Sequence, residues 1–475
     1  MTALDRRTFL AIAASGMLVE PLEDAAGPVF RPEDYGALGD GVRNDSEAFS
    51  KMSAKVTSNG GGTVVFAPRR TYLVGRQRSE GTRAFSPQPL LEFHELTKPL
   101  TIIGNGACLK AAPGLRFGAF DRTTDRAVHR PMPNFDESLM AAPYNGMIVV
   151  RGCRAPITIR DIDLDGNVSR LRIGGRWGDA GWQVPGSGLL LSDNLEQEIV
   201  QNVLSHHHPL DGLIIDGAIG RGRRSHISGL ICRANGRQGT SIVGGRGYDF
   251  EDCEFSATGR SPITSPPGAG VDLEAEGGKT IRDVSFARCK FIDNTGAGMV
   301  ADGGDVEGGH FSDCLFVGTT SWSAWPSKPG FAFDRCTFAG SVVHAFPSRN
   351  PARAAKFLQC HFTDDSRLSP TGHLYIGGSA GNGIVNLEPS DNVLFESCRF
   401  DLQYDGVLPW SWRAIYQDCI MRQVSRTPAM TKGKYLGRTV IDGPVDLYGS
   451  MIVGTVVLNG KRMPPGPVGS DFAHW

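Results

Sequence analysis

The chain has 475 residues, of which 61 are Gly and 29 are Pro, and its formal net charge is −1. So many turn-forming residues indicate a chain with many turns and few helices. A near-neutral sequence without a basic stripe excludes a nucleic-acid-binding protein. The longest apolar stretch is too short to span a bilayer, so we expect no membrane insertion after removal of an N-terminal signal.

The N-terminus has the pattern of an export signal. Residues 5–10 read Asp-Arg-Arg-Thr-Phe-Leu and precede an apolar run from Ala11 to Val19. Paired arginines before a short apolar region resemble a bacterial twin-arginine signal. We therefore predict a signal peptide at residues 1–26 and a periplasmic or secreted protein. A disordered basic start is the alternative.

A short helix is predicted just after the signal. Asn44 or Asp45 can cap a helix over residues 46–57, because an Asn or Asp oxygen accepts hydrogen bonds from the first turn. Such a helix closes the open end of a solenoid. The glycines at 60–62 then precede the first expected strands.

Four segments of this opening resemble a known family. Residues 34–49, 60–68, 72–74 and 100–106 are similar to the opening of pectin-lyase-like β-helix proteins of the pectate-lyase-3 type. That group includes polygalacturonase-like hydrolases, lyases, epimerases and phage tailspikes. The resemblance covers residues 30–106 and implies a right-handed parallel β-helix. It leaves the activity open, since members of the group differ in reaction.

Two clusters offer polar ligands. Asp161, Asp163 and Asp165 alternate on a predicted strand, where they can bind calcium or form a solvated acidic edge. His206, His207 and His208 are adjacent and cannot all face one way, so we expect no metal triad. One of them, His208, is a candidate acid, base or sugar-binding group. We expect no metal site and no cofactor apart from the possible calcium.

Five strands that each begin with a glycine can be laid over one another. They cover residues 188–192, 212–216, 239–243, 270–274 and 298–302. The first and third residues after each glycine are mostly apolar and should face the core, because side chains alternate along a strand. The outward set is then Asp216, Ser241, Asp272, Glu274 and Asp302, and the residues before the glycines add Asp211, Arg237 and Gln238 at the rim.

Asp272 and Glu274 are the predicted catalytic pair. Residues two apart on a strand lie about 6–7 Å apart on one face, and glycoside hydrolysis needs two carboxyl groups about 5–9.5 Å apart. Asp302 is expected one coil away, where repulsion between carboxylates raises one pKa and provides a general acid. The insertion at 258–269 is expected to wall a groove beside them. A solvated carboxylate ladder without function is the alternative.

The predicted substrate-binding residues are His208, Asp211, Asp216, Arg237 and Gln238. Arg237 can hold a sugar carboxylate or stabilise the ionised form of Asp272 through a charge-assisted hydrogen bond, or it can form an ordinary ion pair. In a lyase or epimerase a base removes the C5 proton of a uronic acid. That chemistry engages His208 and Arg237, with the carboxylates in support.

A six-residue pattern, Phe-x-x-Cys-x-Phe, recurs through the second half of the chain. From Cys232 to Cys419 successive cysteines are 21, 36, 25, 22, 24, 38 and 21 residues apart, which is a solenoid period. Short alternating apolar runs between them predict an all-β, right-handed parallel β-helix, a single domain over residues 27–465 with a tail at 466–475. The cysteines are expected to stack inward beside phenylalanines, the alternative being disulfides.

The sequence therefore predicts an exported enzyme that degrades a polysaccharide, foremost as a glycoside hydrolase. A polysaccharide lyase or C5-epimerase acting on uronic acids and a non-catalytic glycan-binding β-helix are the alternatives. Six tryptophans in Gly- or Pro-rich loops offer either sugar-stacking faces or loop packing, and none is assigned. The sequence does not predict the sugar, the linkage or the oligomeric state.

Overall fold

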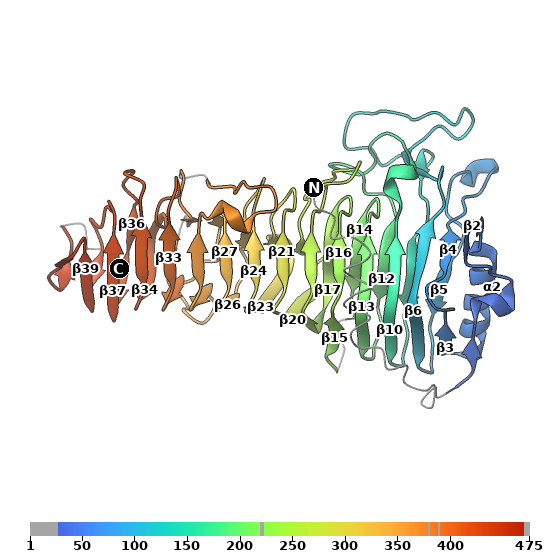
Figure 1. Cartoon of the computed structure of the whole chain (residues 1–475), viewed down its shortest axis with the longest axis horizontal. Helices are drawn as coiled ribbons and strands as arrows, with labels where there is room; N and C mark the ends of the chain where they lie inside the picture. Colours follow the sequence, from blue (N-terminus) through green and yellow to red (C-terminus); the bar gives the residue numbers. More distant parts are fainter. Residues whose placement is uncertain (1–26, 219–222, 379–380, 388–389, 470–475) are drawn as a thin grey trace. The chain divides into compact units, whose positions relative to one another are not determined.

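The computed structural model describes residues 27–218, 223–378, 381–387 and 390–469 (Figure 1). The chain divides into two compact units. Unit 1 is Met1–Thr240 with Gly259–Pro266, and unit 2 is Ser241–Thr258 with Pro267–Trp475. The predicted signal at 1–26 lies outside the described residues. No helix in the described part of the chain has the length and apolar character needed to cross a membrane.

Unit 1 contains the predicted helix, α2 (Ser46–Asn59). Asn44 Oδ1 accepts the backbone N–H of Ser46 at 3.1 Å, whereas the Asp45 carboxylate accepts from the backbone of residues 38 and 39 instead. Gly60 ends the helix in the left-handed conformation at φ 79°, which favours glycine. Phe49 faces inward and contacts the rings of Phe66 and Tyr72.

The first strands lie before the triple glycine, so the prediction that they follow it is wrong. β1 (Val29–Phe30) pairs in parallel with β3 (Gly62–Val65), and β2 (Asp40–Asn44) pairs with β4 (Thr71–Val74). The Phe30 ring lies against Gly62, where a Cβ would come within 2.6 Å of the ring. The glycine thus allows β1 to lie close to β3. Strand periodicity alone does not predict this contact.

Parallel pairing between successive coils builds unit 1. β10 (Ile157–Asp165) lies between β6 (Leu100–Ala111) and β13 (Glu198–His206). A second set, which we call the groove sheet, consists of β5 (Leu91–His94), β9 (Gly146–Arg151), β12 (Ser187–Ser192) and β14 (Asp211–Asp216). The other elements are η2 (Pro32–Tyr35), η3 (Gly81–Arg83), β7 (Arg116–Ala119), β8 (Met140–Ala141), η4 (Val168–Arg170), β11 (Arg172–Ile173), β15 (Ser225–Ser228) and β16 (Ile231–Arg233).

Unit 2 consists of three files of short parallel strands, with one strand of each file per coil over most of its length. The first file is β17 (Gln238–Glu251), whose residues 245–251 pair with β20 (Thr280–Ala287), then β23 (Asp305–Ser312), β26 (Ala332–Asp334), β29 (Lys356–Leu358), β32 (Leu394–Glu396), β34 (Ser411–Gln417), β36 (Thr431–Leu436) and β38 (Met451–Ile452). The second is β18 (Glu254–Ser256), β21 (Lys290–Ile292), β24 (Leu315–Val317), β27 (Thr337–Ala339), β30 (His361–Thr363), β33 (Arg399–Leu402), β35 (Ile420–Gln423), β37 (Arg438–Asp442) and β39 (Thr455–Leu458).

The third file is β19 (Val271–Leu273), β22 (Met299–Ala301), β25 (Ala324–Pro326), β28 (Val342–Val343) and β31 (Val385–Asn386). η5 (Ser366–Leu368) lies in a loop, and β40 (Lys461–Arg462) and β41 (Gly466–Pro467) pair antiparallel with β39 and β38. The prediction of an all-β parallel β-helix with one short helix is confirmed. A single domain over 27–465 with a tail at 466–475 stays a prediction.

The Phe-x-x-Cys-x-Phe motif forms a corner between two strands in unit 2. The first Phe lies in one strand, the residue before the Cys has a positive φ near 54°, and the second Phe lies in the next strand. The rings stack from coil to coil: Phe311 lies 4.8 Å from Phe286 and 4.9 Å from Phe333, with nearly parallel planes. The motif is therefore a repeated core element, as predicted.

The cysteines of the motif point into the core of unit 2. All ten cysteines of the chain are described, and each is a buried free thiol, so the disulfide alternative is wrong. The Cys314 thiol lies 3.3 Å from the carbonyl of Ser312 and 3.4 Å from that of Phe286 on the preceding coil. The thiol thus supplies a weak donor to carbonyls where the left-handed residue bends the strand.

Candidate functional site

The groove sheet of unit 1 carries two outward rows of side chains. On β5 Leu91 and Phe93 are buried, while Glu92 and His94 face outward. Strand register fixes their neighbours: the first row is Glu92, Val149, Leu190 and Ile214, and the second is His94, Arg151, Ser192 and Asp216. Since adjacent strands lie about 4.8 Å apart, each row is a continuous line across four coils.

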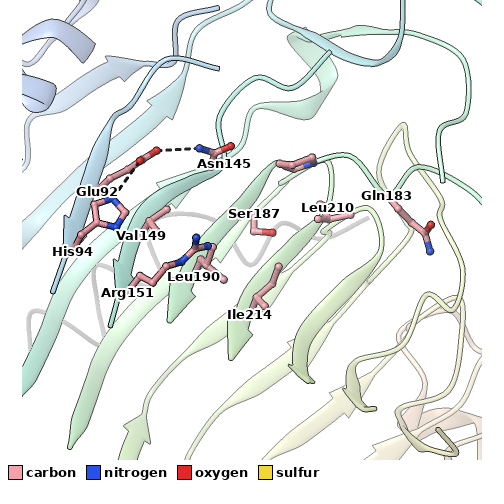
Figure 2. Close-up of a pocket in the computed structure, with 11 residues that line it drawn as sticks. Glu92, His94, Asn145, Val149, Arg151, Gln183, Ser187, Leu190, Leu210 and Ile214 are labelled. Carbon is pink, nitrogen blue, oxygen red and sulfur yellow. Dashed lines mark hydrogen bonds and ion pairs between the residues drawn. The ribbon is translucent and has the colours of Figure 1, made fainter. Parts of the chain in front are cut away.

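A hollow of about 340 Å³ lies over these rows (Figure 2). Its walls come from the groove sheet and from the loops before β9 and β12. Its lining residues are Glu92, His94, Asn145, Val149, Arg151, Gln183, Pro185, Ser187, Leu190, Leu210 and Ile214. This volume lies at the small end of the range of ligand pockets.

The charged and titratable side chains of the hollow lie at its β5 and β9 end. Glu92 accepts a hydrogen bond from Asn145 Nδ2 at 3.1 Å, and its other carboxylate oxygen lies 3.6 Å from His94 Nε2. In the part of the chain that the structure describes, no acidic side chain pairs with the exposed Arg151. An anion that enters the hollow can therefore bind the Arg151 guanidinium without displacing a protein carboxylate.

The floor of the hollow is apolar. Val149 is buried, and Leu190 and Ile214 are half-buried beside it in the same row. Pro185 and Leu210 extend this surface. A sugar ring has an apolar C–H face and polar edges, so a floor of this kind beside one carboxylate, one imidazole and one guanidinium suits a charged sugar.

Among the predicted substrate-binding residues, Asp216 lies in the second row. Its carboxylate accepts a hydrogen bond from Ser192 Oγ at 3.1 Å. The glycine-based alignment is correct here, because Leu189 pairs with Leu213 and Ser192 with Asp216. Asp216 therefore lies on the outward face that the sequence predicts for it.

Two of the three rim predictions, Asp211 and Gln238, are corrected. Asp211 and Gln238 are buried, and Arg237 holds Asp211 through two hydrogen bonds, Nε to Oδ1 at 2.9 Å and Nη2 to Oδ2 at 2.5 Å. A fully desolvated carboxylate needs such a partner, so Arg237 forms the ion pair that was one of its predicted roles, and its predicted effect on Asp272 stays a prediction. Ser241, predicted to face outward, is buried as well.

His208 points into unit 1 and not into a groove, so its predicted position is wrong. It is fully buried, and its Nδ1 lies 3.0 Å from the Tyr144 hydroxyl. Burial lowers the pKa of His208 to about 3, with a smaller contribution from nearby His206. The residue follows left-handed His207 at a coil corner, as Asn235 follows left-handed Ala234 one coil later, and the Asn235 side chain accepts the His208 backbone N–H.

The predicted catalytic pair lies in unit 2, and only one member of it is exposed. Asp272 is 6% exposed, which corrects its predicted outward position. Its register partner Val300 is also buried, in a cluster with Ala269 and Ala297. Ala269 belongs to the insertion, so part of the insertion packs against the face that bears Val300.

Glu274 and Asp302 remain exposed in unit 2. The Glu274 side chain lies against Gly303, where a Cβ would come within 2.4 Å of its Oε1, so it reaches the neighbouring coil beside Asp302. Aromatic rings gather on the following coils: Trp322 lies 4.9 Å from Trp325 and 6.1 Å from Tyr375, and Trp325 lies 5.1 Å from His344. All four rings are half-buried.

The three predicted calcium ligands have separate nitrogen partners. Asp161 pairs with Arg160 at 2.8 Å, Asp163 with His206 at 2.9 Å and Asp165 with Lys110 at 2.5 Å. A bulge between Arg160 and Ile162 interrupts the strand, and Asp161 has a φ of 57°. The alternation that would align three carboxylates on one face is therefore broken.

No family model matches the sequence. A 74-residue stretch is 35% identical to the capsule KN3-specific Depolymerase 1 of Klebsiella phage KN3-1, and the match covers 14% of this chain and 9% of that protein. The structure is similar to the A-module of the mannuronan C-5 epimerase AlgE6 of Azotobacter vinelandii, at 15% identity over 92% of this chain and 100% of that one (TM-score 0.44).

Two further solved structures are similar to this chain. For an exopolygalacturonase from Thermotoga maritima, the identity is 13% over 97% of this chain and 98% of that one (TM-score 0.39). For the N-terminal fragment of bacteriophage Phi29 gene product 12, the identity is 12% over 93% of this chain and 74% of that one (TM-score 0.48).

Proposed function

We propose that the protein is a polysaccharide-acting enzyme whose groove-sheet hollow binds a uronic acid residue and removes its C5 proton. One observation carries the proposal: the unpaired Arg151 lies over an apolar floor beside the Glu92 and His94 pair. Arg151 is suited to the sugar carboxylate, since guanidinium and carboxylate form charge-assisted hydrogen bonds. The floor is suited to the C–H face of the ring.

In this proposal, His94 is the base. Glu92 lies 3.6 Å from His94 Nε2 and orients the neutral imidazole with its N–H at Nε2, so His94 Nδ1 can accept the C5 proton. The C5 electron pair then forms the C4–C5 double bond, the C4–O bond breaks, and the leaving oxygen takes a proton. Arg151 stabilises the negative charge that builds on the carboxylate. Reprotonation of C5 from the opposite face, without C–O cleavage, gives an epimerase instead.

The short match to a capsule depolymerase supports a polysaccharide as the substrate. The predicted twin-arginine signal supports action outside the cytoplasm, in the periplasm or the medium. Replacing Arg6 and Arg7 by Lys is expected to leave the protein inside the cell, which immunoblots of cell fractions measure. Export of the variant at the native level would contradict twin-arginine export.

Glycoside hydrolysis is the second candidate, now with Glu274 and Asp302 in place of Asp272. The observation that favours it is the approach of the Glu274 carboxylate to the coil that bears Asp302. Carboxyl groups on adjacent coils fall near the separation of about 5 Å used by retaining enzymes. The half-buried rings of Trp322 and Trp325 provide stacking surfaces in the same unit.

A panel of uronate-containing and neutral polysaccharides separates the two candidates. Elimination gives an unsaturated, ultraviolet-absorbing product, hydrolysis gives reducing ends alone, and epimerisation exchanges the C5 hydrogen with solvent. Arg151→Gln is expected to lower kcat/KM at least tenfold on the uronate polymer, because it removes a charged contact to the substrate. Arg154→Gln, another exposed arginine of unit 1, is the matched control and should keep full activity.

One outcome would contradict the proposed reaction and support hydrolysis in unit 2. In it, the protein produces reducing ends without ultraviolet absorbance, Glu274→Gln abolishes this activity, and Arg151→Gln retains it. No modification of any polymer would leave the third reading, a glycan-binding protein. Direct binding of the same polymers to the native protein and to Arg151→Gln then shows whether the hollow is the binding site.

A further inference from the structure

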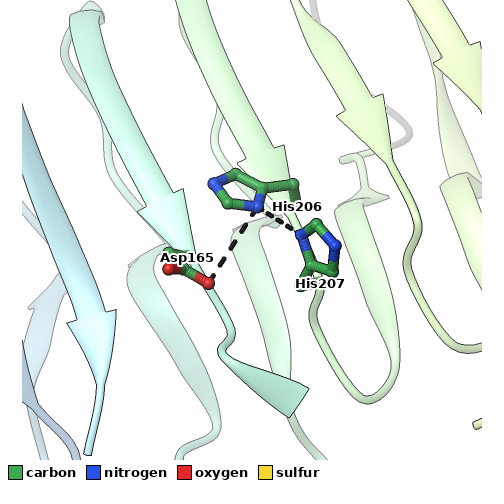
Figure 3. A group of neighbouring side chains, drawn as sticks. All are labelled: Asp165, His206 and His207. Atoms are coloured by element: carbon green, nitrogen blue, oxygen red, sulfur yellow. Dashed lines mark hydrogen bonds and ion pairs between the residues drawn. The ribbon is translucent and has the colours of Figure 1, made fainter. Parts of the chain in front are cut away.

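A second polar cluster of unit 1 lies at the coil corner that follows β13. Asp165, His206 and His207 each direct one possible ligand atom to a common point, and these atoms lie within 4.8 Å of one another (Figure 3). His206 Nδ1 is 2.6 Å from His207 Nδ1 and 4.0 Å from Asp165 Oδ1. None of these residues lines the groove-sheet hollow.

The parallel register and the corner together produce this convergence. Asp165 ends β10 and pairs with His206, which ends β13 on the next coil. His207 has a left-handed φ of 52°, and the corner residue one coil later, Ala234, has a similar φ of 54°. In an extended strand adjacent side chains point to opposite faces, but the left-handed turn brings the His207 ring beside that of His206.

A second carboxylate orients His206. Asp163 Oδ1 lies 2.9 Å from His206 Nε2, and Asp163 is almost fully buried. This contact assigns the imidazole proton to Nε2, so the Nδ1 lone pair is directed at His207 and Asp165. A carboxylate behind an imidazole is the arrangement that holds histidine ligands of metal ions in one tautomer and raises their basicity.

The remaining contacts leave the ligand atoms available. Lys110 Nζ lies 2.5 Å from Asp165 Oδ2, whereas Oδ1 accepts the backbone N–H of Asn167 at 2.8 Å and keeps a second lone pair for a metal ion. The imidazole nitrogens of His206 and His207 face each other so closely that either a proton or a cation must lie between the lone pairs. His208, the third histidine, points into the core and takes no part.

We propose that Asp165, His206 and His207 bind a divalent transition-metal ion. Two imidazole nitrogens with one carboxylate oxygen suit Zn²⁺, Co²⁺, Ni²⁺ or Cu²⁺. Calcium and magnesium prefer sites made of oxygen ligands alone. Three protein ligands leave a further position on the ion for water or for a donor from another molecule. The neighbouring Lys110 cation opposes the charge of the ion and limits its affinity.

Cobalt is the probe for the test, because its visible absorption reports coordination by nitrogen and oxygen. Titration of the full-length protein is expected to show one ion per chain, displaced by Zn²⁺. His207→Gln and His206→Gln should each weaken binding at least tenfold, and Asp163→Asn should weaken it about 10–100-fold through the orientation of His206. His129→Gln, an exposed histidine of unit 1 outside the cluster, is the matched control and should bind normally.

A second readout is stability, since an ion that binds the folded state alone raises the melting temperature. Zn²⁺ should raise the melting temperature of the native protein and of His129→Gln but not that of His207→Gln, while Ca²⁺ should have no effect. No Co²⁺ or Zn²⁺ binding by the native protein in the micromolar range overturns the proposal. Binding by His207→Gln equal to that of the native protein overturns it too. The His207 side chain is exposed, so the melting temperature of the variant without metal should equal the native value.

Discussion

Both units turn the same coil corner, but they fill it differently. In unit 1 the left-handed residues Asp161, Asn202 and Gly229 are followed by the inward side chains of Ile162, Val203 and Leu230. In unit 2 the left-handed residues of the Phe-x-x-Cys-x-Phe motif are followed each time by a cysteine. The corner therefore needs a buried side chain of moderate size, and a thiol is one of several that fit.

The outward side chains also differ between the two units. Unit 2 repeats its core residues coil after coil, whereas the groove sheet of unit 1 changes its outward residues on every coil, from Glu92 to Val149 to Leu190. The repeated residues are those that coil stacking requires, whereas a binding or catalytic site requires different side chains at neighbouring positions. The candidate site accordingly lies where the sequence repeat is absent.

The largest effect expected from the unit 2 stack is on stability. Phe311→Ala removes a fully buried ring that stacks on Phe286 and Phe333, so the free energy of unfolding should fall by about 3–5 kcal/mol. Chemical denaturation followed by fluorescence measures the loss. Val424→Ala, at an exposed position of the same unit, should change stability by less than about 0.5 kcal/mol. A loss as small for Phe311→Ala would show that the stack is dispensable.

For the groove, the expected effect is on activity and not on stability. His94→Gln should lower kcat on a uronate polymer by about 10²–10⁴-fold, the usual contribution of a general base. Because the His94 side chain is 45% exposed, the denaturation midpoint should stay at the native value. A matched loss of stability would assign the residue to the fold, and unchanged kcat would remove it from the mechanism.

The sequence predicts the coils well because their register is set by local patterns. Glycine-led strands align Leu189 with Leu213 and Val271 with Met299, as the structure confirms. On a sheet with an uncovered outer face, the alternation of side chains along a strand then distinguishes inward from outward residues. It fails at Asp272, which is 6% exposed. Its register partner Val300 is buried with Ala269 of the insertion, and alternation carries no record of a segment that packs on the outward face.

Residues missed by the sequence interpretation lie where no repeat marks the coil. Glu92 and His94 alternate with Leu91 and Phe93 in a four-residue strand, which is a usable signal. Arg151 ends an apolar run from Met147 to Val150. Neither signal shows that the two segments pair, because His94 and its register partner Arg151 are 57 positions apart in the sequence. The inward position of His208 depends on the left-handed φ of His207, which the residue pattern does not predict.

The buried His208 gives a pH prediction for unit 1. Its folded pKa of about 3 is depressed, so between about pH 6.5 and pH 3 the unfolded state binds a proton that the folded state does not. Stability should therefore fall by about 1.4 kcal/mol per pH unit on acidification through this window. Tyr144, Asp165, His206 and His207 are the titratable groups that act on it.

His208→Asn isolates that contribution, because Asn235 shows that asparagine fits the equivalent corner one coil later. The difference in unfolding free energy between native protein and variant should grow in favour of the variant as the pH falls from 6.5 towards 3, by the slope given above. Thermal melts at fixed pH steps measure it. Parallel pH profiles for the two proteins would show that His208 is protonated inside the fold.

The smallest expected effect distinguishes the two corner types. Cys314→Ala removes a thiol that faces the carbonyls of Ser312 and Phe286, and the loss should be about 1–2 kcal/mol, from a small cavity and a lost weak donor. Cys314→Ser keeps a donor and should cost less than Cys314→Ala. If serine costs more than alanine, the thiol serves only as apolar filling. The unit 2 corner is then chemically the same as the corner that Ile162, Val203 and Leu230 fill in unit 1.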